Sequence, residues 1–237
     1  MRQATRLTAI VVTVIVALAS AACVSSTQVE ETETVDAETS AAFDPSTVQL
    51  VGNRFAPLTY EEMTDEQQQV ARNILAGPRA GLGGPFNVML RSPEIGDSLQ
   101  ELGARIRFNT FLPDALREMS IIMAGRHWTA HFEWYAHKNA ALRAGLSPAI
   151  VDAIAAGTRP VGMSAEETAL YDFCNQLLEI HQVDQAAFDA AVAAFGERGV
   201  VDTIATVGYY SIVSMLLNVD EYPLPEGVAP ELQPLVR

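Results

Sequence analysis

The sequence predicts an all-helical domain behind an N-terminal leader. Residues that favour helix starts precede most apolar stretches, and glycine or proline follows them. No stretch alternates apolar and polar residues with the period of two that marks a strand. An apolar share of 49% is ordinary for a globular chain, and 237 residues allow one domain or two small ones.

Residues 1–22 have the pattern of a secretory signal peptide. Arg2 and Arg6 give a positive start, residues 7–18 are mostly apolar, and residues 19–22 are small. The apolar run is too short for a membrane-spanning helix, which needs about 20 residues. We therefore expect an exported protein.

Cys23 follows the small residues directly, and two kinds of processing remain open. A bacterial lipoprotein would be cleaved before Cys23 and lipidated there, which would place the protein in the periplasm or cell envelope. Ser20 stands where such sites usually have a leucine-like residue, so ordinary cleavage after Ala21 or Ala22 is the alternative. The polar segment that follows favours the lipoprotein. Contact with a membrane is expected only through this anchor.

Residues 23–53 are predicted to be a flexible acidic tether. Residues 24–53 contain six Asp or Glu and no Lys or Arg, and few large apolar side chains. Such a segment buries too little apolar surface to offset the entropy of ordering. The formal charge of the whole chain is −14, which excludes a nucleic-acid partner because phosphate binding needs clustered cations.

Helix start and stop signals divide residues 54–222, the predicted domain. Capping boxes begin at Thr64 and Ser164, and serine–proline pairs begin helices at Ser92 and Ser147. The expected helices span about 64–76, 92–107, 113–125, 128–144, 147–157, 164–181, 184–196 and 198–218. A proline-rich tail, 223–237, follows the domain.

Glu118, Glu133 and His137 form the candidate catalytic set. Glu133 and His137 are four residues apart and share one face of a helix. Glu118 lies on the preceding predicted helix, and antiparallel packing of the two helices would bring it across. Two carboxylates beside an imidazole make a plausible acid/base set, because burial and like charge shift carboxyl pKa values.

The residues around this set resemble the core of the carboxymuconolactone decarboxylase family. The similarity rests on the runs REMSII (117–122), RHW (126–128), FEWYAH (132–137) and AGLS (144–147). It covers about residues 85–180, with weaker support near 208–210 and 217–218. The resemblance implies an alkylhydroperoxidase D-like (AhpD-like) helical bundle that assembles as trimers or hexamers. It also implies either decarboxylation of a lactone or, in the AhpD branch, thiol-dependent peroxide reduction.

This sequence departs from the peroxide-reducing branch, which carries a CxxC pair between the glutamate and the histidine. Glu118 and His137 match the family pattern, but Ala130 and Glu133 stand at the two cysteine positions. Peroxide reduction of that kind needs a thiolate and a resolving thiol, so this activity, a peroxiredoxin activity, is disfavoured.

The remaining chemistry is that of a cofactor-free lyase or isomerase acting on a small carboxylate or carbonyl compound. We expect protonated His137 to donate to the developing oxyanion. Glu118 would orient His137 or act as the base, and Glu133 would be the second carboxylate. The expected pocket-forming residues are Trp134, Tyr135 and His131.

Three other interpretations stay open. His127 and His131 are four residues apart, and with Glu118 they would form a metal site, although we predict no metal. Cys174 would be the nucleophile of a thiol oxidoreductase, although a small buried side chain is its expected role. A lipoprotein that binds a small ligand without turning it over is the third interpretation.

Overall fold

The structure is a computed structural model of the chain, and it describes residues 44–79 and 81–235. The predicted signal peptide, Cys23 and most of the predicted tether lie outside these residues. The helices described below belong to one compact unit, Phe43–Arg237.

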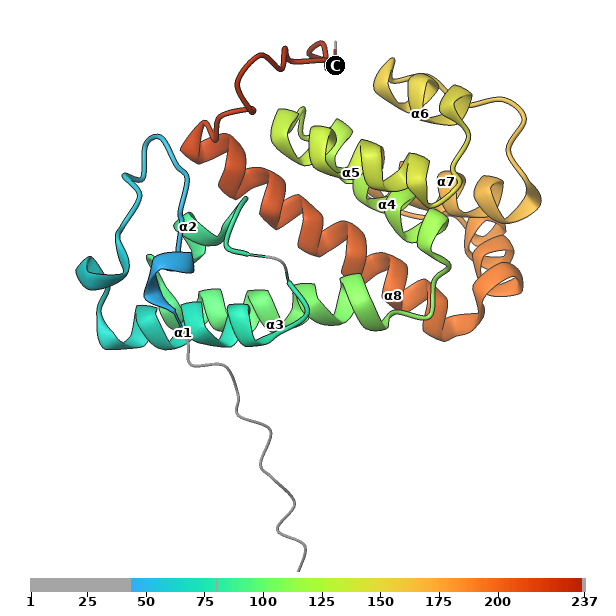
Figure 1. Cartoon of the computed structure of the whole chain (residues 1–237). Helices are drawn as coiled ribbons and strands as arrows, with labels where there is room; N and C mark the ends of the chain where they lie inside the picture. The colour runs from blue at the N-terminus through green and yellow to red at the C-terminus, as the bar shows by residue number, and fades with distance from the viewer. Residues whose placement is uncertain (1–43, 80, 236–237) are drawn as a thin grey trace, which may run out of the picture. The chain divides into compact units, whose positions relative to one another are not determined.

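The described residues form eight α-helices and no β-strand, which confirms the all-helical fold class (Figure 1). Short 3-10 turns at Pro45–Thr47 and Tyr60–Glu62 precede the first α-helix. The α-helices are α1 (Asp65–Ala76), α2 (Phe86–Met89), α3 (Pro93–Asn109), α4 (Asp114–His127), α5 (His131–Arg143), α6 (Pro148–Ala155), α7 (Ala165–Glu179) and α8 (Gln185–Asp220).

Most helices begin at the predicted capping residues. The side chain of Thr64 accepts a hydrogen bond from the Gln67 backbone N–H at 3.3 Å, and Ser164 accepts one from Glu167 at 3.1 Å. Each bond satisfies a backbone N–H that the first turn leaves unpaired. The four-residue helix α2 was not predicted, because the loop expected at 77–85 gives no sequence signal for so short a helix.

The boundary between α4 and α5 differs from the expectation. We predicted a break at Gly125 and a helix from Trp128, whereas α4 continues to His127 and α5 begins at His131. The chain turns at Thr129, whose φ of 48° lies in the left-handed region. The position of Gly125 therefore did not predict where the break between the two helices lies.

Helix α8 consists of two helical segments that meet at a kink, where the sequence predicted the boundary between two helices. Its path is kinked at Gly196, where φ is 67° and ψ is 171°, values outside the helical region. The 36-residue helix α8 is long enough to cross a membrane and contains one sufficiently apolar stretch, but 50% of that stretch is buried inside the fold. A core helix of a soluble protein has these properties too, so they are weak support for a membrane span.

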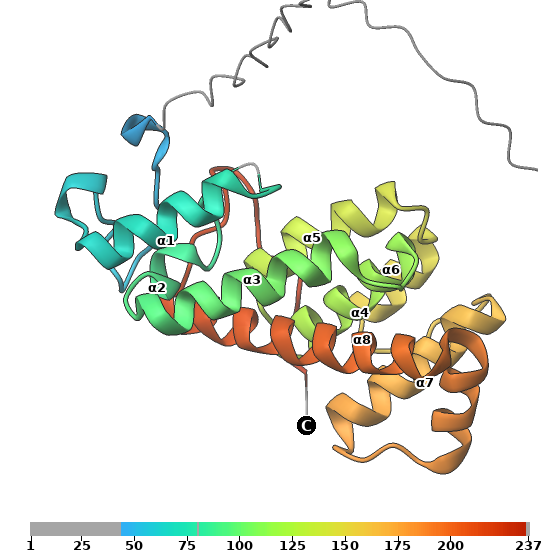
Figure 2. The same ribbon diagram turned by 90° about the horizontal axis from the view of Figure 1, so that it is seen from below.

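Helix α4 occupies the centre of the fold. It packs against α5, α7 and α8, and it is buried on nearly all sides (Figures 1 and 2). Met119, Ile121 and Ile122 have no exposed surface. Because α5 is packed against α4 along its length, polar side chains on their facing surfaces are held between helices.

The folded domain begins earlier than the predicted boundary at residue 54. Val48 and Leu50, assigned to the tether from the sequence, are buried in a hydrophobic cluster with residues of α1, α3 and α8. The backbone N–H groups of Asn53 and Phe55 donate to the Asp220 carboxylate at 3.1 and 2.8 Å. The tether prediction was therefore wrong for about its last six residues, because Val48 and Leu50 pack into the hydrophobic core of the domain.

The C-terminal tail also packs on the domain. Leu232 is 2% exposed and lies in the cluster formed by α4, α5, α6, α7 and α8. We expect Leu232→Ala to lower the free energy of unfolding by about 2–4 kcal/mol, because it removes buried methyl groups and leaves a cavity. Urea denaturation measures this change, and Gln233→Ala, an exposed neighbour, should leave it within about 0.5 kcal/mol. Equal loss in both variants would contradict a specific packing role for Leu232.

Candidate functional site

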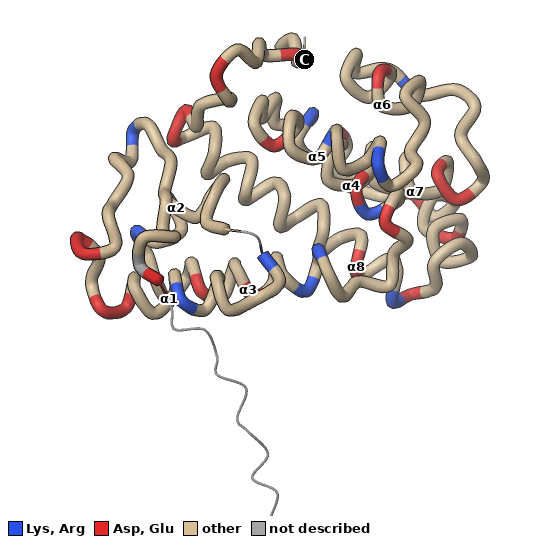
Figure 3. The backbone as a smooth tube through the Cα atoms, in the orientation of Figure 1, with Lys and Arg blue, Asp and Glu red and all other residues tan. Residues whose placement is uncertain are grey.

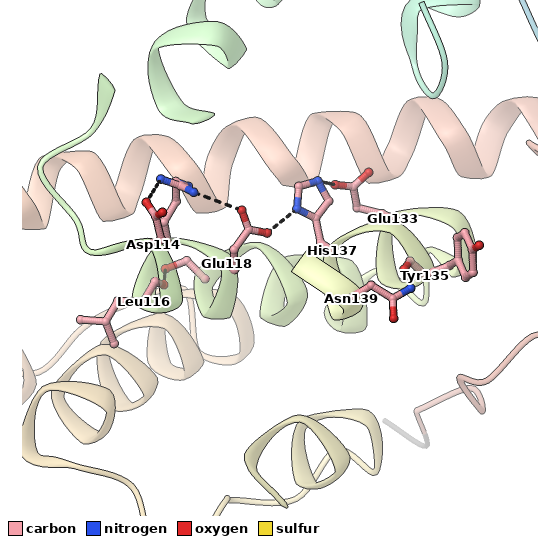
Figure 4. Close-up of polar contacts among 9 residues, drawn as sticks. Asp114, Leu116, Glu118, Glu133, Tyr135, His137 and Asn139 are labelled. Carbon is pink, nitrogen blue, oxygen red and sulfur yellow. Dashed lines mark hydrogen bonds and ion pairs between the residues drawn. The ribbon is translucent and has the colours of Figure 1, made fainter. Parts of the chain in front are cut away.

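The structure brings the three candidate catalytic residues together between α4 and α5. His137 Nδ1 lies 2.7 Å from Glu118 Oε2, a hydrogen bond that joins the two helices (Figure 4). His137 Nε2 lies 3.1 Å from Glu133 Oε1, which is an ion-pair distance without hydrogen-bond geometry. The imidazole is therefore held between two carboxylates, one at each ring nitrogen.

All three side chains are buried: Glu118 is 4% exposed, Glu133 3% and His137 6%. Burial alone would lower the pKa of His137, but the charge of Glu133 and the hydrogen bond to Glu118 outweigh it and raise the pKa to about 9. At neutral pH the imidazole therefore carries a proton on both nitrogens.

Glu118 is ionised for the complementary reason. Burial favours its neutral form, but the hydrogen bond with His137 and the charges of His137, Arg117 and Arg107 lower its pKa overall. Arg117 Nη2 lies 3.4 Å from Glu118 Oε1, and Arg117 Nη1 lies 2.8 Å from Asp114 (Figure 4). Glu118 thus has a cation on each side, and these contacts fix the orientation of its carboxylate.

A cavity of about 220 Å³ opens beside Glu133 and His137. Glu118 does not contribute to its wall, so Glu133 and the imidazole are the members of the set that can meet a ligand. The wall is made by the loop before α2 and by residues of α2, α3, α5 and α8: Arg79, Gly83, Gly84, Pro85, Phe86, Arg107, Phe132, Glu133, Ala136, His137, Tyr209, Tyr210 and Val213.

Sequence reasoning missed the two tyrosines and the two arginines of this wall. The ring of Tyr210 packs edge-on against His137 at 4.9 Å between centroids, and Tyr209 packs edge-on against Tyr210 at 5.1 Å. The pair Tyr209–Tyr210 was visible as part of the weaker family similarity, but its place beside His137 was not. Arg79 and Arg107 carried no sequence signal, because they come from a loop and from α3.

The expected pocket residues do not line this cavity, and this part of the prediction was wrong. Trp134 is 1% exposed and belongs to the hydrophobic core, where its Nε1–H donates to Glu231 at 3.1 Å. Tyr135 points away from His137 (Figure 4). His131 lies at the first position of α5 and is also absent from the wall. The helical period places Trp134 and Tyr135 on other sides of α5 from Glu133 and His137.

The histidine pair considered for a metal is separated by the break between α4 and α5. His127 ends α4, and its Nδ1 lies 2.7 Å from Glu179 Oε1, whereas His131 begins α5. The helical i, i+4 relation that suggested a shared metal therefore does not hold. In the described part of the chain, no group of three or more His, Cys, Asp or Glu side chains is arranged to hold a metal ion.

Cys174 is unsuited to thiolate chemistry. It is fully buried on α7, and this burial raises the pKa of its thiol to about 12. A thiol that stays protonated at neutral pH is a poor nucleophile, and its burial prevents contact with a peroxide. Its role is that of a small core side chain.

Comparison with known proteins supports the fold. No family model and no curated protein matches the chain. Among solved structures, it is similar to an Agrobacterium tumefaciens protein of unknown function described as a candidate antioxidant defence protein, AhpD. The match has a TM-score of 0.51 and 15% identity and covers 60% of this chain and 99% of that one. At this identity the likeness shows an AhpD-like helical fold, and membership of the carboxymuconolactone decarboxylase family stays a prediction.

Proposed function

We propose that this protein is an enzyme that uses Glu133 and His137 to move a proton on a small carbonyl or carboxylate compound. The observation that carries this proposal is a buried imidazole placed between two buried carboxylates at the wall of a cavity. Buried ionisable groups with shifted pKa values in a cavity are typical of acid/base sites.

The three residues have different roles. Glu133 is the base, because its carboxylate lines the cavity beside the imidazole. His137 donates from Nε2 to the oxygen on which negative charge develops, and so stabilises an enolate-like state. Glu118 is a positioning residue, because it holds Nδ1 of the imidazole at 2.7 Å and does not reach the cavity.

This chemistry needs only groups that the chain provides, and it serves both a lyase and an isomerase. In either reaction, electrons move towards a carbonyl oxygen and a proton is delivered or removed at carbon. The peroxide-reducing alternative has no support in the site, because Ala130 and Glu133 occupy the family's cysteine positions and Cys174 is buried.

Deuterium exchange tests the proposal. The purified protein is incubated in D₂O with a panel of small 2-oxo acids and unsaturated lactones, and proton NMR follows the loss of C–H signals and the appearance of products. We expect the wild-type protein to accelerate exchange or conversion of at least one compound. Glu133→Gln should slow it by about 10²–10⁴-fold, because the amide cannot accept the proton.

Glu197→Gln is the matched control, since Glu197 is an exposed carboxylate on α8 away from the cavity. It should react at the wild-type rate. If Glu133→Gln is as fast as the wild type, Glu133 is not the base. Binding of a panel member without any exchange would instead assign the cavity to a non-catalytic binding protein.

We also propose that the protein is exported, anchored through Cys23 and assembled as a homo-oligomer. Export and anchoring are supported by the sequence of residues 1–23 alone. The oligomer is supported only by the family resemblance. Mass spectrometry of the mature N-terminus distinguishes a lipidated Cys23 from cleavage after Ala21 or Ala22, and light scattering measures the oligomeric state.

A further inference from the structure

Two arginine side chains lie in the wall of the same cavity as Glu133 and His137. Arg79 comes from the loop after α1, and Arg107 comes from the C-terminal part of α3. Both also line an adjoining hollow of about 330 Å³ together with Phe86. Two guanidinium groups are therefore presented at a common space that a small ligand can enter.

Neither arginine has a carboxylate at ion-pair distance among the described residues. This is unexpected in a chain with 29 acidic and 15 basic residues, whose acidic positions are spread over several helices (Figure 3). Arg79 donates to the Gln100 carbonyl at 3.3 Å and also interacts with the Tyr209 hydroxyl, and its Nε is buried without a partner. Arg107 makes no hydrogen bond within the described residues, and its guanidinium lies over the Phe108 ring.

The fold makes room for Arg79 at this place. A side chain at Gly103 on α3 would overlap the Tyr209 hydroxyl, and its Cβ would lie 2.7 Å from Arg79 Nη2. Glycine at this position therefore lets the guanidinium and the hydroxyl pack against α3. The guanidinium carbon of Arg79 also lies 5.0 Å from the centre of the Phe86 ring, a cation–π contact that fixes its orientation.

The remainder of the cavity wall suits a flat, partly apolar ligand. Phe86, Phe132, Tyr209 and Tyr210 contribute four aromatic rings. Aromatic side chains pack well against a planar ring or a conjugated chain. A guanidinium binds a carboxylate through two parallel hydrogen bonds, so a planar organic acid matches both the charge and the shape of this space.

We propose that Arg79 and Arg107 bind the carboxylate of a planar, aromatic or conjugated organic acid, and that this carboxylate stays on the substrate throughout the reaction. The statement that the carboxylate stays on the substrate rests on the proposed function. Loss of CO₂ moves the electron pair of the carboxylate into the rest of the molecule. Guanidinium groups stabilise the charged carboxylate more than neutral CO₂ and so oppose that loss.

The reaction that remains is a proton transfer away from the bound carboxylate. A C–H bond breaks, the proton goes to Glu133, and the electron pair moves to a carbonyl oxygen that accepts a hydrogen bond from His137. The proton then returns at another carbon or at the oxygen. No electrons are gained or lost and no group leaves, so the site favours an isomerase over a decarboxylase.

Calorimetric titration of the whole protein with benzoate and with benzamide tests the anion site. The two probes have nearly the same shape, and only benzoate carries the charge. We expect benzoate to bind at least about tenfold more tightly than benzamide, because charge-assisted hydrogen bonds are the stronger ones. Arg107→Gln should weaken benzoate binding about tenfold and leave benzamide binding unchanged.

Arg105→Gln is the matched control, because Arg105 is an exposed arginine on the same helix that does not line the cavity. It should bind both probes like the wild type. Arg79→Gln is a second, independent variant, and Arg107→Lys should recover part of the affinity. Circular dichroism confirms that each variant is folded.

The proposal is overturned if benzoate fails to bind, binds no more tightly than benzamide, or binds equally well to the Arg79 and Arg107 variants. Failure of the proposed function has a different signature. In that case benzoate binding still depends on the arginines, while no panel compound exchanges deuterium. If an acid that needs both arginines for binding releases CO₂, the arginine site still stands, and only the proposal that the carboxylate is retained is wrong.

Discussion

Replacing His137 by asparagine is expected to reduce turnover by about 10²–10⁴-fold and to destabilise the protein by about 3–5 kcal/mol at neutral pH. The variant loses the donor to the developing oxyanion. It also leaves Glu118 and Glu133 buried without the cation that lies between them, at 2.7 and 3.1 Å from its ring nitrogens. Arg117 remains beside Glu118, but at 3.4 Å it offsets only part of that loss.

The instability of His137→Asn should depend on pH in a characteristic direction. Without the imidazolium, burial favours the neutral form of a carboxyl group, so the folded variant takes up a proton more readily than the unfolded chain. Its free energy of unfolding should therefore rise as the pH falls from 8 to 5. Urea denaturation at both pH values measures this, and the deuterium-exchange assay measures turnover.

His181→Asn is the matched control for that experiment. His181 is exposed, and its φ of 64° lies in the left-handed region that asparagine tolerates well. The control should retain wild-type stability and turnover. If the His137→Asn variant is as stable and as active as the control, the imidazole has neither the structural nor the catalytic role assigned to it.

The contact between Glu118 and His137 shows how much of the site the sequence contains. The fold class and most helix starts follow from local signals, such as the capping boxes at Thr64 and Ser164. Two consecutive helices joined by a short connection pack antiparallel, and this places Glu118 near His137. Glu133 follows from the helical period. These residues are close in the sequence, so local rules suffice to group them.

The cavity wall could not be predicted, because it depends on contacts between distant segments. Arg79 and Arg107 reach the site from a loop and from α3, and Tyr210 reaches it from α8. The orientation of α5 relative to these elements decides which of its faces meets the cavity. Trp134, adjacent to Glu133 in the sequence, faces the core for the same reason. Sequence neighbours on a helix differ in direction by about 100° and rarely share a site.

Wild-type stability should fall by about 3 kcal/mol between pH 6 and pH 10, because His137 is charged in the folded protein and must lose its proton. The folded pKa of about 9 lies above the ordinary value of 6.5. The stabilisation is therefore fully present below pH 6.5 and is lost as the pH rises through 9. Glu118, whose folded pKa is lowered from 4.5, contributes stability that is present above pH 4.5 and lost in acid.

Together, these two pH dependences predict that the pair of Glu118 and His137 stabilises the folded protein most between about pH 4.5 and 6.5. Urea denaturation between pH 6 and pH 10 tests the alkaline side, with His137→Asn measured in parallel. Tyrosine and lysine titrate equally in both proteins, and the buried carboxyl groups of the variant take up protons below pH 8, so the difference between the two curves from pH 8 to pH 10 reports on His137. The stability advantage of the wild type over the variant should shrink by about 1.4 kcal/mol between pH 8 and pH 10, as the imidazolium loses its proton. An advantage that stays constant from pH 8 to pH 10 would mean that the imidazole is already neutral in the folded protein, and His137 could then act only as a neutral hydrogen-bond donor.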